Sequence, residues 1–189
     1  METQDERVAR VVAEDVAITA YDAAWPRMFE AEKRHLRACL PGHLIGRIEH
    51  FGSTAVPGLA AKPIVDMLVE VTSLPETRET APAILLPPVY DYFWRALFNE
   101  YVPPFYAFFI KRDSEGQRSH HIHIIEADSE LWDRLLLRDY LIEHPEVAKE
   151  YADLKLQLAA NHAGDRIAYT MAKTEFIVRV TATAKAHYR

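Results

Sequence analysis

The sequence predicts an α+β fold in which helices flank a mixed, mainly antiparallel β-sheet and the C-terminal third of the chain is helical. Residues 63–71 form a short, nearly continuous apolar run, which is typical of a strand buried on both faces. Residues 105–111 and 120–125 flank a polar, turn-like segment that contains Gly116, so they predict an antiparallel hairpin. From Ser129 onward the chain carries helix-start signals without a strand pattern. Strands with interspersed helices and a helical tail are typical of the α+β class.

The composition indicates one globular domain spanning residues 1–189. Hydrophobic residues make up 49% of the chain and charged residues 26%, as in ordinary globular proteins. The formal net charge of -6 gives no overall positive field for a nucleic acid backbone, so nucleic acid is not an expected partner. Cys39 is the single cysteine, which excludes an intrachain disulfide and a thiolate-rich zinc cluster. Residues 1–10 lack a secretory apolar stretch and no run of about 18 apolar residues occurs, so we expect a cytoplasmic protein without a membrane span.

The N-terminal third predicts one helix and one strand before the buried strand. Residues 11–20 alternate loosely and are compatible with a short strand or an extended lead-in. Residues 25–40 carry apolar side chains at helical spacing, with Pro26 in the first turn, where its missing N–H does no harm. Residues 43–51 read as a strand that runs into the turn Gly52-Ser53-Thr54.

Capping signals place the remaining helices. Ser73 is a candidate N-cap for a helix over residues 73–86. Ser129 can cap a helix that continues through Leu141, and Pro145 stands where a new helix can start. Asp165 can cap a last helix that ends near His187.

The Gly-Ser-Thr turn and the strand after it hold the first constellation that points to chemistry. Gly52 and Ser53 end a predicted strand, and such a small-residue turn lets backbone N–H groups approach phosphate oxygens closely. Ser53 or Thr54 can donate further hydrogen bonds, and Lys62 adds a positive charge. Asp66, on the next strand, can hold Mg²⁺, which binds one or two carboxylates together with substrate phosphates. These residues predict a phosphate and metal site capable of nucleotidyl transfer.

Structural explanations stay open for the same residues. A Gly-Ser-Thr turn followed by Pro57 and Gly58 is most often only a turn. An ionised carboxylate inside a buried strand costs several kcal/mol unless it is paired, metal-bound or at a strand end. Pairing of Asp66 with Lys62 or with an arginine therefore stays open as the alternative to a metal.

The run His120-His121-Ile122-His123 is the second constellation. On a strand, alternation places His121 and His123 on one face, with His120 and Ile122 on the other. Two imidazoles on one face can bind a metal or contact a phosphate, and Arg118 just upstream can add a phosphate contact. Histidines and arginines of surface hairpins also occur without function, so that interpretation stays open as well.

Several blocks of the sequence resemble GrpB-like proteins, in order along nearly the whole chain. They are residues 21–26 (Tyr-Asp-Ala-Ala-Trp-Pro), residues 48–66, the hairpin ending in His121-Ile122-His123, residues 137–141 (Leu-Arg-Asp-Tyr-Leu) with His144-Pro145, and Tyr169, Lys173, Phe176 and Ile177. The long block from the Gly-Ser-Thr turn to Asp66 is the most specific of these.

The resemblance implies a fold and a chemistry. GrpB-like proteins are similar in fold to nucleotidyltransferases, and the same domain occurs fused to some bacterial dephospho-CoA kinases, so the resemblance implies a nucleotidyltransferase-like mixed sheet flanked by helices. In that superfamily a Gly-Ser or Gly-Gly pair precedes a strand that bears two acidic residues two positions apart. Gly52, Ser53 and Asp66 match this pattern, whereas Leu68 stands where the second carboxylate is expected. Because nucleotidyl transfer generally uses two metal ions bridged by carboxylates, this departure puts the metal site in doubt.

We expect metal-dependent transfer of a nucleotidyl group from a nucleoside triphosphate to an unidentified small-molecule or protein acceptor. The candidate residues are Gly52, Ser53, Thr54, Lys62 and Arg118 for binding the triphosphate, Asp66 and His123 for catalysis, and Asp66, His121 and His123 for holding a metal, with Mg²⁺ as the expected ion. Leu68 and the fusion to a kinase of the CoA pathway favour instead a nucleotide- or CoA-related binding module that has lost catalysis. A structural partner domain without a ligand and a homo-oligomer also stay open.

Overall fold

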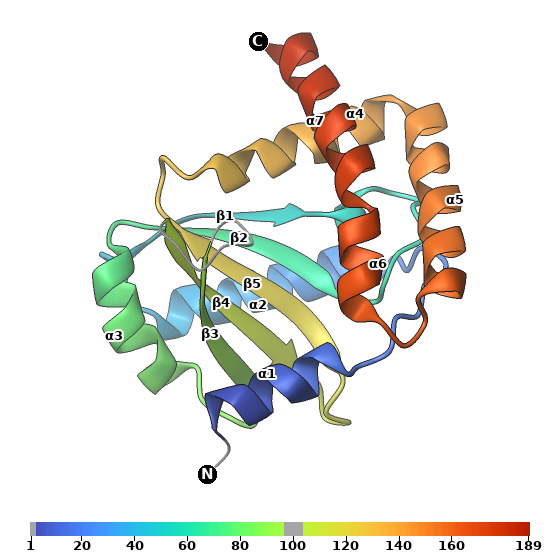
Figure 1. The fold of residues 1–189 in the computed structure, drawn as a ribbon. Coiled ribbons are helices and arrows are strands. Elements are labelled where there is room, and N and C mark those ends of the chain that lie inside the picture. The colour runs from blue at the N-terminus through green and yellow to red at the C-terminus, as the bar shows by residue number, and fades with distance from the viewer. Residues whose placement is uncertain (1–2, 97–103) are drawn as a thin grey trace.

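A five-stranded sheet forms the centre of the computed structural model, which describes residues 3–96 and 104–189 (Figure 1). The strands are β1 (Ile45–Phe51), β2 (Val65–Val71), β3 (Tyr90–Ala96), β4 (Phe105–Arg112) and β5 (Arg118–Ile125), in the spatial order β1-β2-β5-β4-β3. Neighbouring strands are antiparallel except β2 and β5, which are parallel. The predicted mixed, mainly antiparallel sheet is confirmed, and β4 and β5 form the predicted hairpin.

Seven α-helices surround the sheet in the described residues. They are α1 (Gln4–Val12), α2 (Trp25–Cys39), α3 (Leu74–Ile84), α4 (Asp133–Glu143), α5 (Pro145–Asn161), α6 (Arg166–Ala172) and α7 (Thr174–Tyr188), with short 3-10 turns η1 (Ser53–Ala55) and η2 (Glu130–Trp132). The predicted caps act as expected, because the side chains of Ser73, Ser129 and Asp165 accept hydrogen bonds from the backbone N–H groups of Glu76, Leu131 and Ala168. The helical C-terminal third is confirmed.

Three local predictions differ from the structure. The beginning of residues 11–20 is not extended, because α1 runs to Val12 from a capping box of Thr3 and Glu6; beyond α1, Thr19 forms a single bridge with Ala61. The strand β3 was not predicted, although its tyrosines, phenylalanine and tryptophan have high β-propensity. The predicted last helix is two helices, α6 and α7, separated at Lys173.

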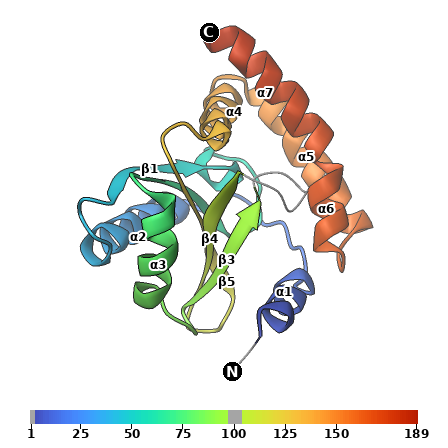
Figure 2. The ribbon, with the colours of Figure 1, turned by 60° about the vertical axis from the view of Figure 1, so that its left-hand side comes forward.

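The two faces of the sheet are covered by different helices. Figure 2 shows α2 and α3 on one side and α1 with α5, α6 and α7 on the other. The side chains of Trp25, Phe29 and Leu36 on α2 pack against Val65, Met67, Val69, Phe109, Ile122 and Ile124 of the sheet, and all of them are buried. On the opposite face Leu68, Phe108 and Ile125 form a second cluster with Val11 of α1 and Leu135 of α4.

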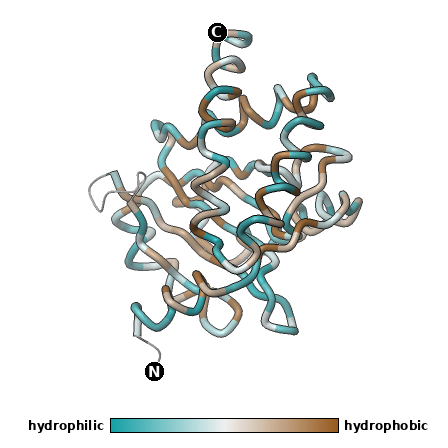
Figure 3. The backbone as a smooth tube through the Cα atoms, turned by 45° about the vertical axis from the view of Figure 1, so that its right-hand side comes forward, coloured by the Kyte–Doolittle hydropathy of each residue, from teal (hydrophilic) through white to brown (hydrophobic). Residues whose placement is uncertain are grey.

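The C-terminal helices pack onto the loop that follows β1. Val56 and Leu59 of this loop lie in a third buried cluster with Leu137, Leu141, Tyr151, Phe176 and Val180. Figure 3 shows hydrophilic and hydrophobic residues alternating along the helices, as expected for helices with one buried face. The docking of these helices brings their polar side chains close to the Gly-Ser-Thr turn. Across residues 3–96 and 104–189, no helix combines the length and the apolar character that crossing a bilayer requires.

Candidate functional site

The parallel pairing of β2 and β5 brings Asp66 opposite His121. Asp66 Oδ1 lies 3.0 Å from His121 Nδ1, and the two side chains are 28% and 13% exposed. Burial lowers the pKa of His121 to about 4, although Asp66 opposes this shift, so His121 is neutral at pH 7. Burial alone would raise the pKa of Asp66, but the hydrogen bond from His121 and nearby positive charges outweigh it and leave the pKa below its usual value. Asp66 is therefore an ionised carboxylate oriented by a neutral imidazole.

Gly52 allows the turn after β1 to approach this carboxylate. Its φ of 73° and ψ of -169° fall in a region that is essentially reserved for glycine. A Cβ atom at this position would lie 2.6 Å from Asp66 Oδ2, which is closer than real Cβ contacts occur. Ser53 begins the 3-10 turn η1 and is hydrogen-bonded to the side chain of Tyr151 on α5.

Thr54 faces the interior of the protein. It is 1% exposed, and its Oγ1 lies 3.0 Å from Nε2 of His50. The hydroxyl of Thr54 is thus used inside the fold, and Gly52 and Ser53 are the members of the turn that adjoin the carboxylate and the C-terminal helices.

Two lysines gather at one aromatic ring near Asp66. The Nζ atoms of Lys62 and Lys173 lie 5.5 and 4.4 Å from the ring centroid of Tyr169, which is 1% exposed. Burial, followed by the charges of Lys173 and Arg166, lowers the pKa of Lys62 to about 7. Burial also lowers the pKa of Lys173 to about 8, with the Asp66 carboxylate acting in the opposite direction. In the described part of the chain, neither lysine has a carboxylate oxygen within 4.0 Å of its Nζ.

Lys155 fixes the loop that leads to Lys62. It is 2% exposed, donates a hydrogen bond to the carbonyl of Ala60, and lies 4.7 Å from the ring centroid of Tyr151. Burial lowers the pKa of Lys155 to about 7. Because it binds the backbone of this loop, Lys155 positions the segment before β2.

Arg118 and His123 have structural partners of their own. Arg118 pairs with Glu14 and with the carbonyl of Val11, and its Nη1 lies 3.5 Å from Nε2 of His121, at the limit of hydrogen bonding. His123 lies opposite Leu68 in the sheet, two residues after His121 and on the same face of β5.

The ring of His123 is surrounded by aromatic rings. The ring centroids of Phe108, Phe51 and Tyr106 lie 4.8, 5.3 and 5.5 Å from its own. Burial lowers its pKa to about 3, and its buried Nδ1 has no hydrogen-bond partner. His123 is thus on the predicted face of β5, but in an apolar environment.

Arg166, at the start of α6, and Lys173, at the junction of α6 and α7, were not among the predicted site residues. Arg166, Tyr169 and Lys173 are spaced three and four residues apart, which places them on one face of a helix. That spacing is visible in the sequence, but nothing local shows that this face docks beside Asp66.

The site residues fit a single Mg²⁺ ion better than a pair. Asp66 offers one partly exposed carboxylate, which is sufficient for an ion that completes its shell with water and phosphate oxygens. Leu68 is 0% exposed and lies within a hydrophobic cluster, so the position of the expected second carboxylate is filled by packing.

Two surface cavities, of about 580 and 350 Å³, lie elsewhere. Glu70 lines the larger cavity and Ile125 lines the smaller one. These two residues pair with each other at one end of β2 and β5, whereas Asp66 and His121 pair near the other end. Neither of these two cavities is lined by Asp66, so the candidate site is identified by the charged side chains around Asp66.

The fold and the site define an α+β protein in which C-terminal helices bring cations to a strand carboxylate beside a Gly-Ser turn. The family model described as GrpB protein matches residues 15–183, and the chain belongs to this family. It is 37% identical over 175 residues to the protein YqkA of Bacillus subtilis, a match that covers 90% of this chain and 47% of YqkA. The chain thus spans about half the length of that relative.

Two further relatives are matched over most of their length. The chain is 32% identical over 164 residues to the glutamate-rich protein GrpB of Alkalihalophilus pseudofirmus, covering 86% of this chain and 92% of that protein. It is also similar to the crystal structure of the conserved protein GrpB from Enterococcus faecalis. There the TM-score is 0.73 at 32% identity, and the match covers 92% of this chain and 100% of that chain.

Proposed function

We propose that the chain binds a nucleoside triphosphate at the Asp66 site and transfers its nucleotidyl group to an acceptor, a small molecule or a protein. The observation that carries this proposal is the pair of lysines, Lys62 and Lys173, held at the ring of Tyr169 near Asp66. Burial and mutual repulsion lower the pKa of Lys62, so its charged form is disfavoured until an anion arrives. A phosphate group between the two lysines would supply that anion, and the turn at Gly52 and Ser53 would add hydrogen-bond donors.

Nucleotidyl transfer assigns a distinct task to each group. An acceptor oxygen would attack the α-phosphorus, the bond from that phosphorus to its bridging oxygen would break, and pyrophosphate would leave with the bonding electrons. Asp66, oriented by His121, is the candidate ligand for the metal, and the acceptor's proton would pass to solvent. When bound, Mg²⁺ would neutralise phosphate charge, with Asp66 as its protein ligand. His123 has no part in this scheme because its ring lies among aromatic side chains.

A second candidate function is a nucleotide- or CoA-related binding module without turnover. Leu68 favours it, because this buried residue leaves the strand with one carboxylate at the place where two would bridge a metal pair. Both candidates require the same lysines. They differ in whether pyrophosphate is released.

Binding and turnover should be measured on the same variants. We expect ATP, CTP, GTP or UTP with Mg²⁺ to raise the melting temperature of the native chain and to release pyrophosphate, with CoA as a further ligand in the binding screen. Asp66→Asn should abolish the Mg²⁺-dependent part of the shift and lower turnover about 100-fold or more. Lys62→Met should weaken binding of every nucleotide.

Asp153→Asn is the matched control, since Asp153 is an exposed carboxylate paired with Lys149 on α5. It should behave as the native chain does. Binding without pyrophosphate release would favour the binding module, and a screen without any shift would refute both candidates.

A further inference from the structure

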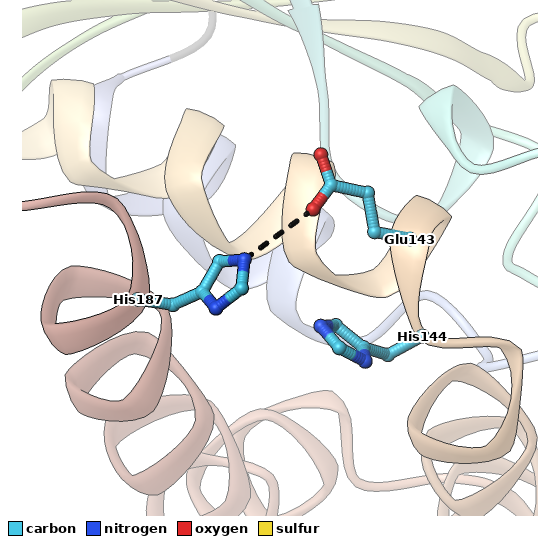
Figure 4. Close-up of side chains that lie close together, drawn as sticks. All are labelled: Glu143, His144 and His187. Carbon is cyan, nitrogen blue, oxygen red and sulfur yellow. Dashed lines mark ion pairs between the residues drawn. The ribbon is translucent and has the colours of Figure 1, made fainter.

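A second group of ligand-type side chains lies where the end of α4 meets the last turn of α7 (Figure 4). Glu143 is the last residue of α4, His144 follows it, and His187 projects from α7. One ligand atom from each residue lies within 4.8 Å of the other two. Among the described residues, no other three His, Cys, Asp or Glu side chains bring their ligand atoms this close together.

The ring of His144 is held in place by its neighbours. It packs on Tyr140 with ring centroids 4.0 Å apart, and its Nδ1 lies 3.4 Å from Oε1 of Glu146. A carboxylate at one ring nitrogen is the usual arrangement around a metal-bound histidine, because it leaves the other nitrogen to bind the ion. The other nitrogen, Nε2, is buried and has no hydrogen-bond partner. Such an unsatisfied buried atom requires an explanation, and a bound cation provides one.

Glu143 and His187 face each other at a distance that suits two ligands of one ion. Glu143 Oε2 and His187 Nε2 are 3.7 Å apart, which is too long for a hydrogen bond. Two nitrogen or oxygen ligands bonded tetrahedrally to Zn²⁺ are about 3.3 Å apart. Figure 4 shows a ring nitrogen of His144 on the side of its ring that faces His187. A small movement of these side chains would bring all three to bonding distance.

We propose that Glu143, His144 and His187 bind a divalent transition-metal ion of the Zn²⁺ class, with water in the fourth position. Two imidazoles and one carboxylate suit Zn²⁺ better than Mg²⁺ or Ca²⁺, which prefer all-oxygen sites. The side chains of Glu143 and His187 are 51% and 49% exposed, so water and the ion can reach the site from their side. The ion would tie the last turn of α7 to the corner between α4 and α5.

Calorimetric titration of Zn²⁺ into tag-free, chelator-treated protein tests this proposal. The titration should be done in an Asp66→Asn background, which removes the carboxylate of the other site. We expect one ion per chain and a rise in melting temperature with Zn²⁺. His187→Gln should lower the affinity at least 10-fold and abolish the thermal shift. Because His187 is exposed at a helix end, this substitution should leave the fold intact, which circular dichroism would verify.

His43→Gln is the control, since His43 is exposed and lies 2.7 Å from a carboxylate oxygen of Glu76 without a third ligand. It should leave the affinity for Zn²⁺ unchanged. Co²⁺ should give visible absorption bands in the native chain that disappear in His187→Gln. Equal Zn²⁺ affinity of His187→Gln and its parent, or no bound ion in the parent, would overturn the proposal.

Discussion

Gly52 and His121 hold the Asp66 carboxylate from two sides. His121 hydrogen-bonds to Oδ1, while Gly52 leaves the space beside Oδ2 that any other residue would fill. The orientation of the carboxylate therefore depends on His121, and the space that it occupies depends on the missing side chain of Gly52. The contact with His121 joins residues that are 55 positions apart in the sequence.

Gly52→Ala should lower the free energy of unfolding by about 1–3 kcal/mol, because alanine is strained at this φ and ψ and its Cβ would meet Asp66 Oδ2. Urea unfolding monitored by circular dichroism measures this change. Gly42→Ala is the control, because a Cβ at Gly42 would meet nothing within 4 Å. The control should change the free energy by no more than about 0.5 kcal/mol. Equal stability of both variants would contradict the close approach of the turn to Asp66.

The partner of Asp66 shows the limit of sequence reasoning at this scale. Alternation along β5 correctly placed His121 and His123 on one face. Pairing with Lys62 or an arginine was the alternative to a metal site that Asp66 shares with histidines of β5, and the structure pairs Asp66 with His121. Only the register between β2 and β5 decides this, and a register between strands this far apart has no local signal.

At the scale of elements, α1 is fastened to the sheet by a chain of ion pairs. Arg10 pairs with Asp91 on β3, Asp91 with Arg112 on β4, and Arg112 with Glu14, each at 2.8 Å. Glu14 also pairs with Arg118 at the start of β5. Burial alone would raise the pKa of Glu14, but its hydrogen bonds to the two arginines outweigh this and lower it. The position of α1 thus rests on Glu14 as much as on the apolar contact of Val11.

Glu14→Ala should lower the free energy of unfolding by about 1–3 kcal/mol, because it leaves the buried guanidinium group of Arg118 without a carboxylate and leaves Arg112 with Asp91 alone. Chemical denaturation provides the measurement, and hydrogen exchange should show loss of protection in α1 first. Lys149→Ala breaks an exposed pair with Asp153 on α5 and serves as the comparison. Lys149→Ala should lower the free energy of unfolding by about 0.5 kcal/mol or less. If Glu14→Ala lowered the free energy of unfolding by no more than Lys149→Ala does, the ion pairs of Glu14 would not stabilise the packing of α1 on the sheet.

At the scale of the whole molecule, four histidines of the sheet are kept neutral by the fold. Burial lowers the pKa of His50 to about 4, of His121 to about 4 and of His123 to about 3, and it lowers the pKa of His120 as well. In the unfolded chain their pKa is near 6.5. Between about pH 6.5 and 4 the unfolded chain therefore binds more protons, and stability is lost as the pH falls through this window.

The free energy of unfolding should thus fall steadily between pH 6.5 and 4. Carboxyl groups with a lowered pKa, such as Asp66, change the stability mainly below this pH window. The lysines with a lowered pKa, Lys62 and Lys155, change it mainly above the window. Urea unfolding at several pH values measures the slope. His123→Phe should make the slope shallower, because it replaces one of these histidines with an apolar ring among aromatic neighbours. A stability that does not depend on pH in this window would show that these histidines are not buried as described.

The sequence by itself determined most of the elements, their caps, the Gly-Ser turn and the side of β5 that carries His121 and His123. These features depend on the periodicity of apolar residues and on the spacing of capping and turn residues within one segment, so the segment alone is enough to predict them. Tertiary structure alone decided that Asp66 meets His121, that His123 is enclosed by aromatic rings, and that Lys173 reaches the site. The physical reason is that strand register and helix docking are set by burial between distant segments, to which no local pattern is sensitive.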